Sequence, residues 1–541
     1  MATHEVRNQV PPLVDYDAAD YPALTEALLR AGARHVLEEL HRVGRMAGSA
    51  EAMQWGDLAE AHPPQLKTHD RYGNRIDEVD YDPAYHRLLR QAVEFGLGGT
   101  AWTDPLPNPH LARAAKLSVW GQTDAGHGCP ISMTYGVVPA LRHNAALASQ
   151  YEPLLTSTNY EPGLRDPLSK RGLLAGMSMT EKQGGSDVRA NTTTAVSQSD
   201  GSYLITGHKW FTSAPMCDVF LVLAQAPAGL SCFFVPRVLP DGSRNTFALQ
   251  RLKDKLGNRS NASSEVEYDN TVGWLVGEEG RGVATIADMV NMTRLDCTIG
   301  SASAMRIGVT LAAHHATYRC AFGATLIDQP LMRNVIADLA VEAEGATTVA
   351  MWLAGLVDKD GNEHADLLRR ISLAISKYYV CKRAPIHVAE ALECHGGNGY
   401  IEESRMPRLF RESPLMSIWE GTGNVAVLDV LRAMAKQPQA LAVFLDEIKL
   451  GAGADARLDA AIAALEQQFT DFDTMQYRAR RVVGEMAQVL QGSLLVRFGH
   501  PAVADAFCAS RLGRDHGDVH GTLPVGTDIA AIIDRCTPKL S

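Results

Sequence analysis

A glutamate beside an indole and a run of small residues is the strongest candidate for chemistry in the sequence. Glu420 follows Trp419 and precedes Gly421 within the stretch Ser417–Asn424. A carboxylate can remove a proton next to a carbonyl group when an electron acceptor lies close by. The small residues after Glu420 would let a large planar cofactor approach the backbone. A loop end without chemistry is the alternative, so these eight residues need support from the rest of the chain.

A second candidate is the polar segment Met177–Asp187, which contains two consecutive glycines. Backbone amides near Gly184 and Gly185, with the hydroxyl groups of Thr180 and Ser186, could donate hydrogen bonds to a heterocycle or a pyrophosphate. A glycine turn with a capping aspartate is the simpler interpretation of this segment alone.

The segment Gly207–Ser213 places an aromatic pair, Trp210 and Phe211, directly before two hydroxyl side chains, Thr212 and Ser213. Such a group suits stacking on a flat ring and contacts to its edge. The end of a strand with a tryptophan in the core is an equally good interpretation.

Two further segments could contact phosphate groups. Arg319 lies in Tyr318–Gly323, where its guanidinium could bind a phosphate, although a surface arginine at a helix end is the alternative. The glycine-rich stretch Glu393–Tyr400 could let backbone approach an adenine or a pyrophosphate. It has neither the Gly-Lys-Ser/Thr of a P-loop nor the spacing of a Rossmann turn.

Bulk composition indicates a large globular protein without a global attraction to nucleic acid. The chain has 541 residues, 46% of them hydrophobic, and a net charge of −11. Its nine cysteines are scattered and include no Cys-x-x-Cys, which argues against disulfides and a structural zinc site and predicts no metal. With no apolar leader and no long apolar run, we expect no contact with a membrane and a cytoplasmic location.

Hydrophobic periodicity predicts four regions and an α+β fold. Apolar residues recur at helical spacing after an extended arm in region 1–165. Short runs rich in Val, Phe and Tyr, separated by turn residues, predict a barrel-like β domain at 166–282. Long amphipathic stripes predict a four-helix bundle at 283–437, with Glu420 in the loop that enters its last helix. Region 438–541 is expected to be an additional helical domain.

The order of these motifs resembles the acyl-CoA dehydrogenase superfamily over roughly residues 90–435. A helical domain is followed by M-T-E…G-S-D, K-W-F-T-S, R-x-x-F-G, G-G-x-G-Y and W-E-G-T-G. Lys182-Gln183, Gly128–Pro130 and Gln329–Arg333, with the C-terminal extension, resemble the alkylation-response flavoproteins of this superfamily along nearly the whole chain.

This resemblance implies a fold, a cofactor and a set of site residues. It implies FAD between the β domain and the bundle, with Glu420 as the base that takes the α-proton of an acyl-CoA thioester. The Glu420 backbone amide would help to hold the thioester oxygen, and Trp419 would raise the pKa of Glu420. The residues implied in FAD binding are Met177, Met179, Thr180, Gly185, Ser186, Trp210, Phe211, Thr212, Ser213, Arg319, Ile418, Trp419, Gly421, Thr422, Gly423 and Asn424.

The same resemblance implies partners. Arg319 and the Gly396-Gly397 loop would reach a neighbouring subunit's FAD, which implies a homotetramer built as a dimer of dimers. Alkylation-response relatives imply weak dehydrogenation of an isovaleryl-CoA-like substrate and binding of double-stranded DNA by the C-terminal domain.

Two functions therefore stay open: a DNA-protecting flavoprotein and a catabolic acyl-CoA dehydrogenase without a DNA role. Residues 435–541 hold eleven Lys and Arg against thirteen Asp and Glu, a net charge of −2, so DNA would need a local patch. The candidates for that patch are Arg478, Arg480, Arg481, Arg511 and Arg514. A solvated surface is the alternative for this arginine group.

Overall fold

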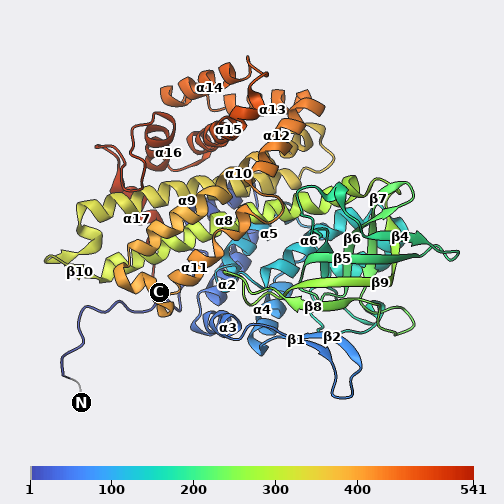
Figure 1. Cartoon of the computed structure of the whole chain (residues 1–541). Coiled ribbons are helices and arrows are strands. Elements are labelled where there is room, and N and C mark those ends of the chain that lie inside the picture. Colours follow the sequence, from blue (N-terminus) through green and yellow to red (C-terminus); the bar gives the residue numbers. More distant parts are fainter. Residues whose placement is uncertain (1–2, 541) are drawn as a thin grey trace. The chain divides into compact units, whose positions relative to one another are not determined.

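The computed structural model describes residues 3–540 and divides the chain into two compact units. The barrel unit comprises residues 51–109 and 123–296, and the bundle unit comprises 1–50, 110–122 and 297–541. Both units contain part of the N-terminal helical region, so compact packing does not follow the order of the chain. Each unit is described by itself (Figure 1).

A closed sheet forms the core of the barrel unit. Strands β6, β4, β5, β9 and β7 follow one another by hydrogen bonding, and a β6–β7 pairing closes the ring. Strand β3 adds to β6, and β8 adds to β9. The predicted barrel-like domain is therefore confirmed (Figure 1). Its strands are β3 Ala175–Ser178, β4 Thr194–Ser197, β5 Tyr203–Ser213, β6 Val219–Ala226, β7 Gly229–Pro236, β8 Ala248–Leu252 and β9 Ser263–Val276.

Helices and a hairpin complete the barrel unit. Asp82 caps helix α4 by accepting a 2.8 Å hydrogen bond from the Ala84 amide, as its position before Pro83 predicts. The hairpin β1–β2 was not predicted, because its strands are mostly polar and lack a hydrophobic alternation. The elements are α3 Ala50–Ala61, β1 Gln65–His69, β2 Arg75–Asp80, α4 Pro83–Glu94, α6 Gly128–Leu141 and α7 Ala145–Leu155.

Four long helices form the frame of the bundle unit, as predicted. They are α8 Gly282–Tyr318, which enters this unit at Cys297, α9 Pro330–Val357, α10 Glu363–Glu393 and α12 Gly423–Lys436. Helix α11, Met406–Glu412, and a short hairpin, β10 Cys320–Ala321 with β11 Ala324–Thr325, lie in the connections. Helices α1 Pro22–Arg30, α2 Leu37–Ala47 and α5 Pro109–Trp120 precede them in the chain, and α1 packs against α9.

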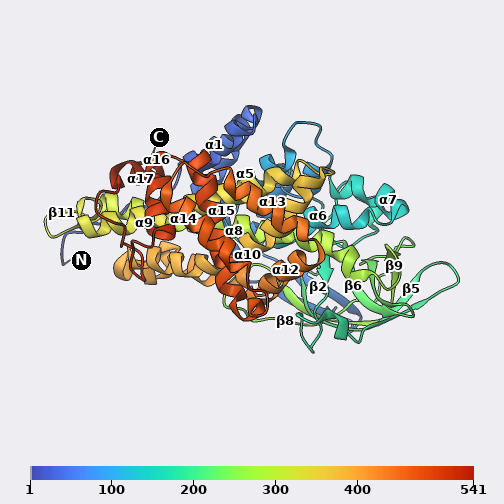
Figure 2. The ribbon, with the colours of Figure 1, turned by 90° about the horizontal axis from the view of Figure 1, so that it is seen from above.

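The C-terminal region packs directly on the bundle. Helix α15, Met475–Phe498, contacts α9, α10 and α12 (Figure 2). Helix α17, Ile529–Cys536, packs on α9, where Arg535 pairs with Glu344 at 2.7 Å and with Glu26 of α1 at 2.9 Å. The region is therefore an integral part of this unit. Its other helices are α13 Pro438–Lys449, α14 Ala456–Gln468 and α16 Pro501–Phe507.

Across residues 3–540, no helix is both long enough and apolar enough to cross a membrane.

Candidate functional site

Glu420 lies in a sharply turned loop of the bundle unit. The residue is 8% exposed, and its φ of 58° lies in the left-handed region. Gly421 follows with a φ of 103°, which glycine adopts without the penalty that other residues meet. Helix α12 begins two residues later, so Glu420 stands at the entrance of the last bundle helix, where the sequence places it.

The residues around Glu420 present a surface on both sides of the turn. Ile418 is 60% exposed, and Thr422 and Asn424 are exposed at the N-terminus of α12. Thr422 makes no side-chain capping hydrogen bond, so its hydroxyl group is available beside the first amides of the helix. Trp419, Gly421 and Gly423 are half-buried. This segment offers hydroxyl, amide and apolar groups to one ligand.

A buried ion pair holds together the two candidate segments of the barrel unit. Lys209 of β5 donates a 2.9 Å hydrogen bond to Glu181, and both side chains are 0% exposed. Burial alone would raise the pKa of Glu181, but Lys209 and the amides of Thr192 and Thr193 outweigh it and lower the pKa to about 2. Neither residue was predicted as part of the site. Opposite charges in two neighbouring candidate motifs were the available signal.

A bulge in β5 turns both aromatic residues of the second segment outward. Lys209 pairs with Val266 and Thr212 with Ser264, so two residues of β5 face one residue of β9. Phe211 is 48% exposed and Trp210 is half-buried. The bulge explains how neighbouring residues of a strand share a face.

Thr212 and Ser213 lie differently from the aromatic pair. Thr212 is 0% exposed, and its hydroxyl group bonds to that of Ser178. Its carbonyl accepts a 2.8 Å hydrogen bond from Ser264. Ser213 is half-buried, 3.0 Å from the Ser263 hydroxyl. In this structure Thr212 lies beneath the surface and joins β5 to β3 through Ser178.

Cations surround the Trp210 ring, which the sequence did not indicate. The Lys253 ammonium lies 3.1 Å from the ring centroid and the Arg251 guanidinium 5.5 Å from it. Glu265, opposite the bulge, accepts from both, at 2.5 and 2.6 Å. These cation–π contacts restrain the indole ring.

The glycine-containing loop after β3 is shaped by close approach. A Cβ at Gly185 would lie 2.6 Å from Thr180 Oγ1, so a larger residue there would force the Thr180 side chain to move. Trp210 donates from its backbone to the Thr180 carbonyl at 2.8 Å, which joins this loop to β5. Gly185 and Ser186 are exposed, whereas Met177 is buried and Met179 half-buried. The exposed amides and hydroxyl are the groups suited to a phosphate.

Arg319 holds the N-terminal arm in this structure. Its guanidinium donates to the Asn8 carbonyl, while the Asn8 side chain exchanges two 2.8 Å hydrogen bonds with the Cys320 backbone. Arg319 is half-buried, and Gly396 lies in the turn after α10 with a φ of 58°. The rings of His315 and His395 lie 4.7 Å apart and bring these two segments together.

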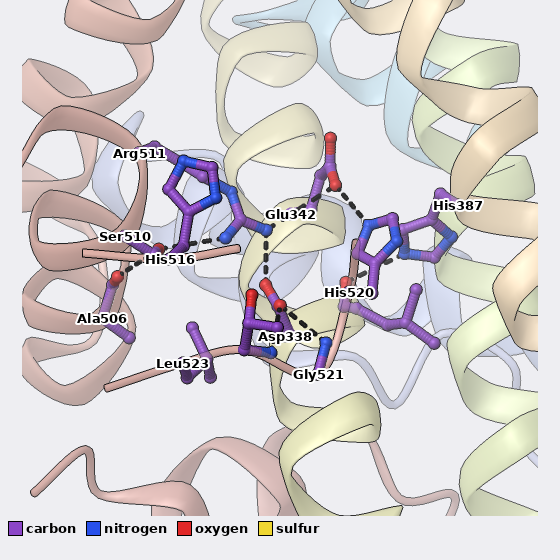
Figure 3. Close-up of polar contacts among 12 residues, drawn as sticks. Asp338, Glu342, His387, Ala506, Ser510, Arg511, His516, His520, Gly521 and Leu523 are labelled. Atoms are coloured by element: carbon purple, nitrogen blue, oxygen red, sulfur yellow. Dashed lines mark hydrogen bonds and ion pairs between the residues drawn. The ribbon is translucent and has the colours of Figure 1, made fainter. Parts of the chain in front are cut away.

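The structure separates the five arginines proposed for DNA. Arg511 is an internal ion-pair partner, because its side chain is 9% exposed and contacts Asp338 at 2.5 Å (Figure 3). Glu342, 3.7 Å from Arg511, also accepts from His520 at 2.8 Å and from Arg383. The helical segment that contains Arg511 ends at residue 512, so Arg514 lies beyond it.

The other four arginines differ in how they are held. Arg478 donates to Gln468 and to the Asp471 carbonyl, which ties the loop between α14 and α15. Arg480 donates to the Tyr378 hydroxyl at 3.3 Å. Arg481 and Arg514 are 66% and 73% exposed, and both lie beside Glu485. These last two make a local cationic surface.

No metal site was expected, and among the described residues no group of three or more His, Cys, Asp or Glu could hold a metal ion. His127 is buried, with its Nδ1 3.2 Å from Asp124. Asp124 also accepts from Ser260 at 2.9 Å, so the pair joins a loop to the sheet domain.

Family comparisons define the class of protein. Residues 176–271 match the acyl-CoA dehydrogenase middle domain and residues 280–435 its C-terminal domain. Residues 8–162 match the N-terminal domain of the adaptive response protein AidB. The chain belongs to the acyl-CoA dehydrogenase family, and is thus an FAD-dependent oxidoreductase.

Individual relatives narrow this class. The chain is 43% identical to the putative acyl-CoA dehydrogenase AidB of Escherichia coli (strain K12) over 94% of both chains. It is 30% identical to acyl-CoA dehydrogenase family member 11 of Caenorhabditis elegans, over 90% of this chain and 85% of that protein. The crystal structure of Caenorhabditis elegans ACDH-11 in complex with C11-CoA is similar, with a TM-score of 0.85 and 27% identity over 99% of this chain and 93% of that one.

The donor set fits FAD. A dinucleotide with a flat ring system needs amide and hydroxyl donors for its pyrophosphate and apolar surface for its ring. The exposed Gly185 and Ser186 provide the former and the outward Trp210 and Phe211 the latter. Within the bundle unit, taken by itself, Thr422 and Asn424 present polar groups at the N-terminus of α12.

Proposed function

We propose that the chain dehydrogenates an acyl-CoA thioester between its α- and β-carbons, with Glu420 as the base. The observation that supports this most is a buried carboxylate held at a φ of 58° at the entrance of α12. A left-handed glutamate is rare and costly, and such backbone strain concentrates at functional sites. Its place in the matched family region agrees with this role.

The proposed reaction assigns each change to a group. Glu420 takes the proton from the α-carbon, and the electron pair of that C–H bond becomes part of the α,β double bond. When bound, FAD supplies the acceptor for the hydride that leaves the β-carbon. Negative charge grows on the thioester oxygen meanwhile, and the peptide N–H of Glu420 is the donor we assign to it.

The Glu420→Gln variant tests this proposal. We expect normal FAD content and an unchanged oxidised-flavin spectrum, but anaerobic bleaching by acyl-CoA slowed by about 10³-fold or more, because the amide cannot take the proton. Glu403→Gln is the matched control, since Glu403 is exposed and outside this loop. Bleaching at the normal rate in Glu420→Gln would place the base elsewhere.

The acyl chain is tested by a panel in the same assay. We propose weak turnover of a short branched thioester such as isovaleryl-CoA. Support comes from 26% identity, over 73% of this chain, to the isovaleryl-CoA dehydrogenase of Oryza sativa subsp. japonica. A linear eleven-carbon acyl-CoA is the contrasting substrate, because the similar Caenorhabditis elegans structure holds C11-CoA. Faster bleaching by the linear thioester would overturn the branched assignment.

We further propose that the chain forms a homotetramer in which Arg319 and the Gly396-Gly397 loop serve a neighbouring subunit's FAD. Large apolar side chains near these segments are exposed: Phe322 at 99% and Tyr400 at 81%. Light scattering with size-exclusion chromatography measures the mass. A monomer that retains FAD would contradict this arrangement.

A second candidate function is binding of double-stranded DNA, as the family resemblance implies. The exposed Arg481 and Arg514 support it, since two guanidinium groups share the single carboxylate of Glu485. We expect Arg481→Ala with Arg514→Ala to weaken duplex binding and to make its salt dependence shallower by roughly two contacts. The control is Lys359→Ala with Lys539→Ala, which removes the same charge from exposed positions elsewhere.

The outcome of that assay separates the two functions. No retention of a duplex at low salt, with acyl-CoA bleaching intact, would favour the catabolic dehydrogenase. The cytoplasm is the proposed location for either function, because the nine cysteines are all free thiols, as expected in a reducing compartment.

A further inference from the structure

The loop that contains Glu420 is held by a lysine from a neighbouring helix. Lys377 of α10 donates a hydrogen bond from its ammonium to the Gly421 carbonyl. Gly421 directly follows Glu420, and both residues have positive φ. A non-glycine residue in the left-handed region costs on the order of 1 kcal/mol, so its surroundings must hold it there. The anchored carbonyl is one such restraint.

Lys377 is unusual because its charge is buried without a counter-charge. The residue is 1% exposed. Within residues 3–540, its ammonium makes one hydrogen bond, to Gly421, and no ion pair. An ammonium taken out of water without a carboxylate is costly, and Met would fill a similar volume without that cost. The cost argues for a function at this position beyond packing.

The neighbouring side chain of α10 contacts the other end of the same loop. A Cβ at Gly423, the first residue of α12, would lie 3.4 Å from the Tyr378 ring, so the helix begins against this tyrosine. Arg480 of α15 donates to the Tyr378 hydroxyl and restrains the ring. The consecutive residues Lys377 and Tyr378 therefore restrain the exit of the loop at two points, Gly421 and Gly423.

We propose that Lys377 is a positioning residue for Glu420: by holding the Gly421 carbonyl, it fixes the direction in which the Glu420 side chain and peptide N–H point. This inference rests on the proposed role of Glu420 as the base. Lys377 touches neither substrate nor cofactor in this role. Its effect is on the step in which Glu420 takes the proton, and binding of the acyl-CoA is left largely unchanged.

Three substitutions at one position separate geometry from charge. Lys377→Met removes both the donor and the charge, Lys377→Gln keeps an N–H donor without charge, and Lys377→Arg keeps both on a longer side chain. We expect the bleaching rate of Lys377→Met to fall by about 10²-fold, as for a misplaced catalytic group, with the dissociation constant for the acyl-CoA changed less than threefold. Gln or Arg should recover part of the rate.

Hydrogen exchange supplies a readout that does not depend on turnover. We expect faster exchange across residues 413–424 in Lys377→Met, because the turn loses its anchor, and slower exchange again in Lys377→Gln. The matched control is Lys382→Met, an exposed lysine on the same helix whose side chain lies beside Gly423. It should leave both the bleaching rate and the exchange unchanged.

The outcomes distinguish this inference from the proposed base. If Glu420→Gln still bleaches normally, the base itself is wrong. If Glu420→Gln is inactive and Lys377→Met bleaches at the normal rate, only the positioning role fails. A rate loss that merely follows loss of FAD in all three Lys377 variants, with unchanged exchange in the loop, would also overturn it.

Discussion

Two fully buried lysines, one in each unit, support the candidate segments in different ways. Lys209 of the barrel unit and Lys377 of the bundle unit are both 1% exposed. Lys209 meets a carboxylate, Glu181, which also accepts from two backbone amides. Lys377 meets a single backbone carbonyl, that of Gly421. The two lysines are thus equally buried, but only Lys209 has an opposite charge to offset the cost of burial.

The difference indicates two roles: Lys209 stabilises the fold of its unit, whereas Lys377 fixes the conformation of one turn. In a buried ion pair, each charge offsets the desolvation penalty of the other. Removal of either side chain therefore leaves the remaining charge buried without compensation. A cation on one carbonyl contributes little to overall stability and acts on the conformation of that peptide. We therefore expect substitutions at Lys209 to affect folding most and substitutions at Lys377 to affect chemistry most.

The largest expected effect is that of Lys209→Met. Glu181 would stay buried with a charge and no ammonium, which costs roughly 3–5 kcal/mol of unfolding free energy. The loop Met177–Asp187 would separate from β5, so FAD content should fall as well. Urea unfolding of the purified protein, with flavin absorbance at each step, measures both quantities.

A double substitution tests whether this loss belongs to the pair. Lys209→Met combined with Glu181→Leu removes both charges and should be closer to the normal protein than Lys209→Met alone. A double variant whose loss equals the sum of the losses of Lys209→Met and Glu181→Leu would show that the two side chains are not coupled. The contrast with Lys377 would then lose its basis.

Acid should remove part of the same contribution. The pKa of Glu181 is lowered to about 2 from an ordinary 4.5, so its stabilising effect is complete above pH 4.5 and is lost as pH falls through about 2. The difference in melting temperature between the normal protein and Glu181→Gln should therefore narrow over this window. A gap that stays constant down to pH 2 would contradict the pairing. The acceptor of the Lys377 hydrogen bond is a backbone carbonyl, which does not titrate in this range. The difference in melting temperature between the normal protein and Lys377→Met should therefore not narrow over the same window.

Most of the architecture followed from periodicity, since long amphipathic helices and alternating strands bury one face each. The helices of the bundle, predicted from long amphipathic stripes, are an example. The β1–β2 hairpin was missed because its residues are mostly polar and its pairing is set by contacts with distant segments, such as the Leu249 amide on Asp77. Closure of the barrel through β6–β7 likewise depends on pairing that no local pattern specifies.

The residues of the candidate site were predicted from their types and their order in the chain. The buried residues that hold these segments in place were not predicted. Exposed groups such as Ser186 and Phe211 belong to motifs that a sequence displays. Glu181, Lys209 and Lys377 act through burial and through partners far along the chain, and burial of a charge contradicts the usual expectation for these residue types. Arg511 shows the converse, because a local cluster of arginines gave no sign that one of them is internal.

An intermediate effect is expected for Gly421→Ala. Gly421 has a φ of 103°, where a Cβ is strained, so we expect a loss of about 1–3 kcal/mol in unfolding free energy. The Lys377 acceptor would move with the strained peptide, and bleaching should slow together with faster exchange in residues 413–424. Gly355→Ala is the control, since a Cβ at this helical glycine would meet nothing within 4 Å and its φ is not in the left-handed region.

The smallest stability effect is expected for Lys377→Met. One carbonyl loses its donor, at about 1 kcal/mol, while removal of an uncompensated buried charge offsets that loss. The free energy of unfolding of Lys377→Met, measured in urea, should therefore lie within about 1 kcal/mol of that of the normal protein and well above that of Lys209→Met. If Lys377 serves mainly to orient Glu420, an apolar side chain can replace it without unfolding the bundle. A loss of unfolding free energy comparable with that of Lys209→Met would therefore mean that Lys377 anchors the fold as Lys209 does.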